Sequence, residues 1–209
     1  MLRIQGGRKK ASTLLRILAL AAAAALVASC VLNPKSDPKP IPDPVDTDRN
    51  RKTTDNLVTK WLPHVYSTMD SIKYEETLDE AYIFELLPEE VDDDDPRGWW
   101  DKTEELAIAG NMFGARFNET GQKVSRITLD LVAKNTVVDN TNYPGKPPGE
   151  VWKKVTSAVD LKVVVDDPTD PEGIINFIVI SDQIFVCRPD PDVDTLWVIY
   201  KQIDQPSIN

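Results

Sequence analysis

The sequence predicts an α+β domain, with N-terminal helices packed on one face of a curved, mainly antiparallel sheet of four to six strands. The first observation is helical periodicity in the part of the chain that follows residue 54. The second is a set of four later segments rich in Val, Ile, Thr and aromatic residues, which favour strands, at 123–138, 150–167, 172–189 and 194–204. Helices that precede a run of strands are typical of this class. The same order also fits a β-sandwich with an N-terminal helical cap.

Apolar residues spaced by three or four positions predict the helices. Pro63 suits a first helical turn, so we expect the main helix to begin near it. A second short helix is expected over 73–80, followed by an extended segment over 81–87. The main helical face consists of Leu57, Trp61, Val65, Met69 and Ile72. A further helix is predicted after residue 98 by a stripe of Trp99, Leu106, Ala109 and Phe113.

The strands are predicted by the alternation of apolar and polar residues and by the turn segments between them. Ile127, Leu129 and Leu131 alternate with polar residues, as in a half-buried strand. Segments rich in Pro, Gly, Asp and Asn separate the four strand segments at 140–149, 167–173 and 189–194. These turns favour antiparallel neighbours.

The first 29 residues have the pattern of an export signal. Residues 1–16 are basic, and Ile17–Ala28 form a short apolar core. This core is shorter than the roughly 20 residues that span a bilayer, and small residues follow it. The sequence therefore predicts a secretory signal peptide over 1–29.

The tetrad VASC at 27–30 resembles the lipobox of bacterial lipoproteins. The resemblance implies cleavage before Cys30, diacylation of its sulfur and acylation of the new amino group. Two or more acyl chains give stable membrane anchoring, whereas one gives marginal residence. Val31 is not an aspartate, and by the same resemblance this implies sorting to the outer membrane, with the periplasmic or surface face left open.

Residues 30–53 are predicted to form a tether between the lipidated cysteine and the domain at 54–209. Prolines at 34, 38, 40, 42 and 44 favour an extended polyproline conformation. Twenty such residues reach on the order of 60 Å at about 3.1 Å per residue. A ligand segment for an SH3-type domain is the alternative interpretation.

The charge of the chain disfavours nucleic acid and anionic lipid head groups as partners. Residues 1–29 hold five of the 24 Lys and Arg, so 19 remain against 34 Asp and Glu. Phosphate binding needs clustered cations. One histidine and two cysteines do not make a zinc site. The acidic runs at 92–95 and 166–173 offer oxygen ligands for calcium as an alternative, but they lack the ligand spacing of an EF-hand and are more typical of solvated loops. We expect no cofactor and no metal.

Several later segments resemble the nuclear transport factor two-like superfamily, which includes SnoaL-like and ketosteroid-isomerase-like proteins. The segment 196–204 resembles its last strand through Trp197, Ile199, Lys201 and Asp204, although Gln202 stands where an aromatic residue is common. Phe185 and Arg188, Trp152 and the helix after residue 98 also match. The resemblance implies a cone-shaped sheet with an apolar pocket. A cystatin-like roll is the neighbouring alternative.

The candidate site residues are four aromatic side chains. Tyr66, Tyr82, Trp100 and Tyr200 are candidates to line the pocket. His64 is expected at the surface of a first helical turn, and Asp160 on the solvent face of a strand. No residue matches the catalytic Tyr and Asp of the isomerase, so no catalytic residue is assigned. Cys187 is expected to be a buried strand thiol, with an intermolecular disulfide as the alternative.

These observations predict a membrane-anchored envelope lipoprotein that binds a small apolar ligand or a protein partner without catalysis. An isomerase-like or dehydratase-like enzyme is the first alternative. A structural or assembly role, with formation of a homodimer through the exposed sheet face, is the second.

Overall fold

The computed structural model describes residues 50–91, 96–114, 122–166 and 174–206. The chain divides into two units, Met1–Val45 and Asp46–Asn209, and all that follows concerns the second. The predicted signal peptide, Cys30 and most of the tether lie outside the described residues, as do the acidic runs at 92–95 and 167–173.

The helix that contains Pro63 starts nine residues before it. Thr53 caps it through a hydrogen bond from Asn56 N to its hydroxyl group. The helix comprises α3 (Thr54–Asn56), a π-helical turn η1 (Leu57–Trp61) and α4 (Leu62–Thr68). Proline lacks a backbone N–H and its ring crowds the preceding turn, so a widened turn just before Pro63 lets the helix continue through it.

The helical face predicted from spacing ends earlier than expected. Met69 has a left-handed backbone (φ 51°) and terminates α4, so the chain turns away before Ile72. Ile72 lies in α5 (Ser71–Glu75) and is 70% exposed. The helix predicted over 73–80 is wrong in its second half, because strand β1 (Leu78–Glu85) already begins there.

The third helix starts after the tryptophan pair. Trp99 belongs to the short strand β2 (Trp99–Asp101) and is 41% exposed, so it is not part of the helical stripe. The helix α6 (Lys102–Phe113) begins with a capping box, in which Asp101 and Glu104 each bond the other's backbone N–H. This reciprocal pair fixes the start of the helix.

The six strands in the described ranges form one mixed sheet in the order β2-β1-β6-β5-β4-β3. The long strands are β3 (Lys123–Asp139), β4 (Trp152–Asp166), β5 (Ile174–Pro189) and β6 (Trp197–Gln205). All neighbours are antiparallel except β1 and β6. A short 3-10 turn, η2 (Pro88–Glu90), follows β1. The α+β class and the four C-terminal strands are confirmed, while the parallel pairing of β1 was not predicted.

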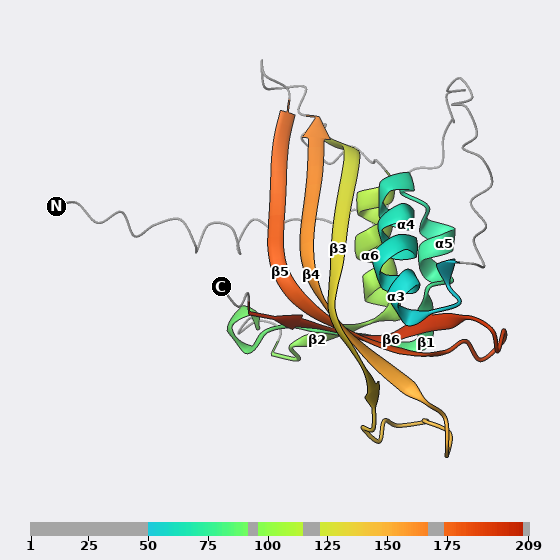
Figure 1. The fold of residues 1–209 in the computed structure, drawn as a ribbon. Helices are drawn as coiled ribbons and strands as arrows, with labels where there is room; N and C mark the ends of the chain where they lie inside the picture. The colour runs from blue at the N-terminus through green and yellow to red at the C-terminus, as the bar shows by residue number, and fades with distance from the viewer. Residues whose placement is uncertain (1–49, 92–95, 115–121, 167–173, 207–209) are drawn as a thin grey trace. The chain divides into compact units, whose positions relative to one another are not determined.

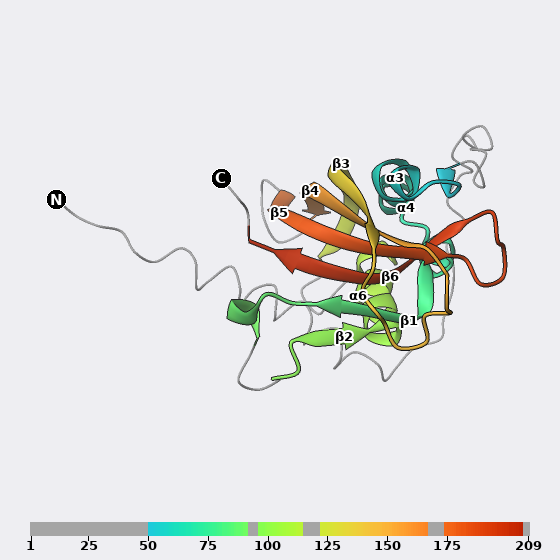
Figure 2. The same cartoon turned by 60° about the horizontal axis from the view of Figure 1, so that its bottom comes forward.

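The helices cover one face of the sheet, which we call the inner face; the opposite face is the outer face. Figure 1 shows α4, α5 and α6 grouped beside β3, and the long strands bending where they meet β6. Figure 2 shows the order of the strands from β2 to β3. None of the helices in the described ranges is long and apolar enough to span a bilayer. The core lies between the helices and the inner face, with Trp61, Val65, Ile127, Val155, Phe185 and Ile199 among its buried members.

Arg51 joins the start of the domain to the sheet. Its Nη2 lies 2.7 Å from Asp190 Oδ2, and its carbonyl oxygen accepts a hydrogen bond of 3.0 Å from Trp197 N. The side chain is buried, since only 9% of it is exposed. The folded contacts of the domain therefore include residue 51, which precedes the boundary expected at 54.

Candidate functional site

A buried carboxyl group lies among aromatic side chains between the helices and the inner face. Glu105 of α6 is 6% exposed. Its Oε1 accepts a hydrogen bond of 2.5 Å from the hydroxyl of Tyr74, and its Oε2 accepts one of 2.6 Å from Trp100 Nε1. Both carboxyl oxygens are therefore bonded to donors of the core.

Two of the predicted candidates surround this group with Tyr74. Tyr66 OH donates to Tyr74 OH at 3.3 Å, and the two rings meet edge to face. Trp100 stacks on Phe84 with ring centres 4.3 Å apart. These contacts hold the donors that face Glu105 in fixed positions, because each ring is packed on a second ring.

The pKa values of the group reflect burial. Burial raises the pKa of Glu105, and the hydrogen bonds from Tyr74 and Trp100 oppose this rise. Burial raises the pKa of Tyr74 as well, and the nearby Glu105 carboxyl adds to that rise. No ion pair joins Glu105 to a cation within the described ranges. A carboxyl group buried without a cation is costly to ionise.

A second polar row continues from Tyr82 along the inner face. Tyr82 OH donates to Gln202 Oε1 at 3.2 Å, and Gln202 Nε2 donates to Gln183 Oε1 at 2.8 Å. Gln183 also bonds Asp204, whose carboxyl is hydrogen-bonded to that of Glu90. Burial raises the pKa of both carboxyls, and the nearby Asp204 charge raises that of Glu90 further. Two such carboxyls share a proton more readily than they both ionise.

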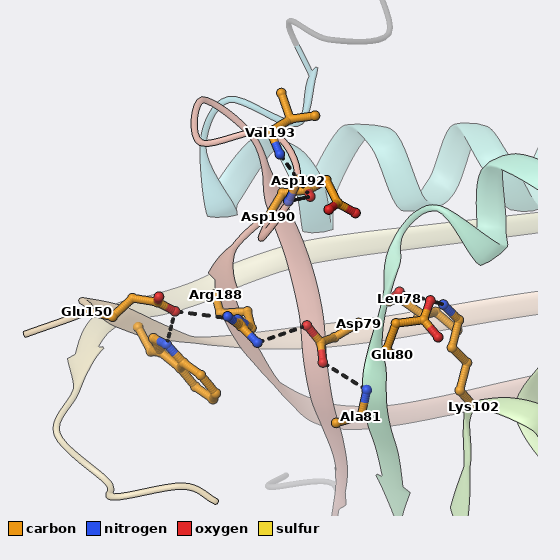
Figure 3. A network of polar contacts seen from close by, with 11 residues as sticks. Leu78, Asp79, Glu80, Ala81, Lys102, Glu150, Arg188, Asp190, Asp192 and Val193 are labelled. Carbon is orange, nitrogen blue, oxygen red and sulfur yellow. Dashed lines mark hydrogen bonds and ion pairs between the residues drawn. The ribbon is translucent and has the colours of Figure 1, made fainter. Parts of the chain in front are cut away.

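The fourth predicted candidate lies elsewhere. Tyr200 packs on the outer face against Trp152 and Val186, with its ring centre 4.6 Å from that of Trp152. Close by, Arg188 lies between Asp79 and Glu150, at 3.3 and 3.4 Å, and Trp152 Nε1 donates to Glu150 (Figure 3). The structure therefore brings Tyr66, Tyr82 and Trp100 to the inner face and separates Tyr200 from them.

Of the remaining candidates, Cys187 is buried as expected, whereas His64 and Asp160 are half-buried. His64 lies in the first turn of α4 beside the Trp61 ring, and burial lowers its pKa. Asp160 lies on the outer face and bonds Lys162 Nζ at 3.0 Å. Cys187 is a free, fully buried thiol, and burial raises its pKa. Within the described residues, no three His, Cys, Asp or Glu side chains gather in a way that could hold a metal ion.

Glu105 was missed at the level of sequence, although the sequence holds a signal for it. Glu105, Ala109 and Phe113 are spaced by four residues, so they share one face of α6, and all three are buried. A charged residue on an apolar stripe marks a buried polar contact. Glu90 and Asp204 carried no such signal, because their contact depends on how η2 folds back on β6.

Comparisons with known proteins give similarity of structure only. No protein-family model matches the chain, and no curated protein matches it. The similar solved structures include a protein from Novosphingobium aromaticivorans, provisionally called an aromatic ring hydroxylase (TM-score 0.49, 15% identity, covering 77% of this chain and 91% of that one). They also include a nuclear transport factor 2-like superfamily protein from Salmonella enterica serovar Typhimurium (TM-score 0.42, 15% identity, covering 71% of this chain and 84% of that one). A third is a ketosteroid isomerase-like protein from Erwinia carotovora (TM-score 0.35, 13% identity, covering 68% of this chain and 84% of that one).

Proposed function

We propose that the chain is a lipid-anchored protein of the bacterial cell envelope whose domain binds another molecule through the outer face of β3, β4 and β5, without catalysis. The VASC tetrad supports the anchor at Cys30, and by Val31 the outer membrane is the expected location. The proline-rich residues 30–53 would hold the domain away from the membrane surface.

The observation that carries the binding role is an exposed apolar surface on the outer face. Ile178 and Ile180 of β5 are 58% and 70% exposed, and Val132 of β3 is 65% exposed. All three side chains point away from the helices, because they pair in register with Lys162, Asp160 and Ala158 of β4, which alternate along that strand with core-facing residues. Large apolar side chains gathered on one exposed face mark interaction sites.

A photoreactive residue at position 180 tests the binding role in cells. We expect a covalent adduct at Ile180 and none at Ile72, which is equally exposed at 70% but lies on α5. Absence of an adduct at position 180, or equal labelling at both positions, would contradict the proposal. An adduct of twice the chain mass would favour the structural role, with a second copy as the occupant.

The anchor is tested separately by membrane fractionation and mass spectrometry. We expect acylated Cys30 at the N-terminus of the mature protein, and loss of the membrane pool in a Cys30→Ala variant. A Cys30→Ala protein that still sediments with membranes would refute the anchor.

A proton-transfer enzyme is the second candidate function, and one observation favours it. The Glu90 and Asp204 carboxyls are hydrogen-bonded to each other and only partly buried, and such a pair can take up and release a proton. Turnover of isomerase or dehydratase substrates that disappears in Asp204→Asn, and persists in the Asp130→Asn control on the outer face, would replace the binding proposal.

A further inference from the structure

Two neighbouring rows of the outer face enclose a shallow depression of about 190 Å³. The sheet register places six side chains there as a grid of two rows across three strands. The first row is Arg126, Val164 and Asn176, and the second row is Thr128, Lys162 and Ile178. Paired residues on one face have Cβ atoms about 4.5–5.5 Å apart, so the six side chains form one continuous lining.

The lining is positive in a chain that is otherwise acidic. It holds two cations, Arg126 and Lys162, and no carboxylate. Lys162 is compensated by Asp160 in the next row, at 3.0 Å from Oδ2. Arg126 is exposed and forms no ion pair with any of the described residues. On the other side of Arg126, Asp166 lies on the same face in the row beyond Val164 and is paired in register with Lys123. The depression therefore presents one guanidinium without an ion pair among the described residues, and its planar donors match a carboxylate.

The other groups of the lining define the rest of the ligand. Thr128 follows Arg126 on the same face of β3 and supplies a hydroxyl group, and Asn176 on β5, across Val164 from Arg126, supplies an amide. Both groups can donate hydrogen bonds. Ile178 lies at the opposite side of the depression and is followed on the same face by Ile180, which is 70% exposed. An apolar path thus leads out of the charged depression along the strand.

We propose that this depression binds the carboxylate head group of an aliphatic amphiphile, with its chain lying over Ile178 and Ile180. The inference rests on the proposed function, because it names the ligand class of the same outer face. A monovalent carboxylate balances the single free charge of Arg126, whereas a phosphate dianion would bring a second negative charge next to Asp160. The small volume admits the head group and leaves most of the chain on the surface.

Titration with sodium decanoate tests the proposal. The full chain is studied in phosphatidylcholine nanodiscs, with empty nanodiscs as the blank, and the methyl resonances of Ile178 and Ile180 report binding. We expect saturable shifts for decanoate and binding at least about tenfold weaker for neutral decanol, since a charged hydrogen bond contributes about 1.5–3 kcal/mol. Decyl phosphate is expected to bind no better than decanoate.

Two variants with the same change in net charge separate the site from general electrostatics. Arg126→Gln is expected to weaken decanoate binding about tenfold or more, and Lys60→Gln, at an exposed position on η1, to change it less than about twofold. Equal affinity for decanol, tighter binding of decyl phosphate, or equal effects of the two variants would overturn the proposal. Labelling at position 180 with no response to decanoate would refute this inference alone and leave the proposed function standing.

Discussion

Replacement of Glu105 gives the sharpest test of how the inner face is held together. In Glu105→Ala, the hydroxyl of Tyr74 and Nε1 of Trp100 lose their acceptors at 2.5 and 2.6 Å. The buried Tyr74 donor left without an acceptor costs about 1–3 kcal/mol, and loss of the bond from the half-buried Trp100 adds to this, so we expect a loss of at least about 1–3 kcal/mol in the free energy of unfolding. A domain has about 5–15 kcal/mol in total, so the loss is large.

Glu105→Gln is the matched variant, because it keeps the volume of the side chain. Its carbonyl oxygen can accept from Trp100 Nε1, while its NH₂ group donates to the Tyr74 hydroxyl, which can turn its own hydrogen toward Tyr66. We therefore expect a smaller cost than for Glu105→Ala, of about 0–1 kcal/mol. Urea unfolding of the full chain at pH 7 measures both variants. A cost below about 1 kcal/mol for Glu105→Ala, or a larger cost for Gln than for Ala, would refute the reasoning.

The pH dependence of the same group has a fixed sign. The pKa of Glu105 is raised in the folded state, so the folded protein binds more protons than the unfolded chain between the two pKa values. The stabilisation that the protonated Glu105 gives to the folded state is complete below the pKa of about 4.3 in the unfolded chain, and it is lost as the pH rises through the pKa in the folded protein. The stability advantage of the native protein over Glu105→Gln should therefore shrink with rising pH across this window, measured as the urea midpoint. An advantage that grows would contradict the assignment.

Two further predictions concern the sheet. Cys187 is fully buried with a raised pKa, so a thiol reagent followed by mass spectrometry should modify it no faster than the protein unfolds; rapid modification of the folded protein would contradict this burial. Arg188→Gln leaves the side chain of Asp79, 4% exposed, without its cation and should cost about 3 kcal/mol in urea unfolding. Arg97→Gln breaks an exposed ion pair and should cost less than about 1 kcal/mol, so equal costs would show that burial does not govern these pairs.

The sequence predicted the elements best where a single period extends over many residues. Leu57, Trp61 and Val65 are almost fully buried, as their spacing predicts. The alternation of Ile127, Leu129 and Leu131 likewise gives the buried face of β3. In both cases one face of one element packs on the core, so the local spacing of apolar residues is sufficient to predict which side chains are buried.

Predictions from the sequence failed where long-range contacts determine where a strand begins or which face a side chain occupies. Strand β1 begins at Leu78 because Ile199 N bonds the carbonyl of Thr77 and because β6 pairs with it in parallel. No local pattern encodes that partner. Tyr200 was grouped with the inner aromatic residues, but the irregular pairing of β5 with β6 beside it places its ring with Trp152 on the outer face. An extra residue in one strand changes which face its neighbours occupy.

The clamp formed by Arg51 sets how the domain responds to mechanical load. Tension on the chain that precedes residue 51 would act on the Arg51–Asp190 ion pair and on the hydrogen bond from Trp197 N before it reaches the first helix. Both partners flank the turn between β5 and β6, two adjacent strands in the interior of the sheet. Because interior strands are bonded on both sides, a pull would be shared by several strands at once. A pulling force applied at the N-terminal side of the domain would then not unfold the helices first.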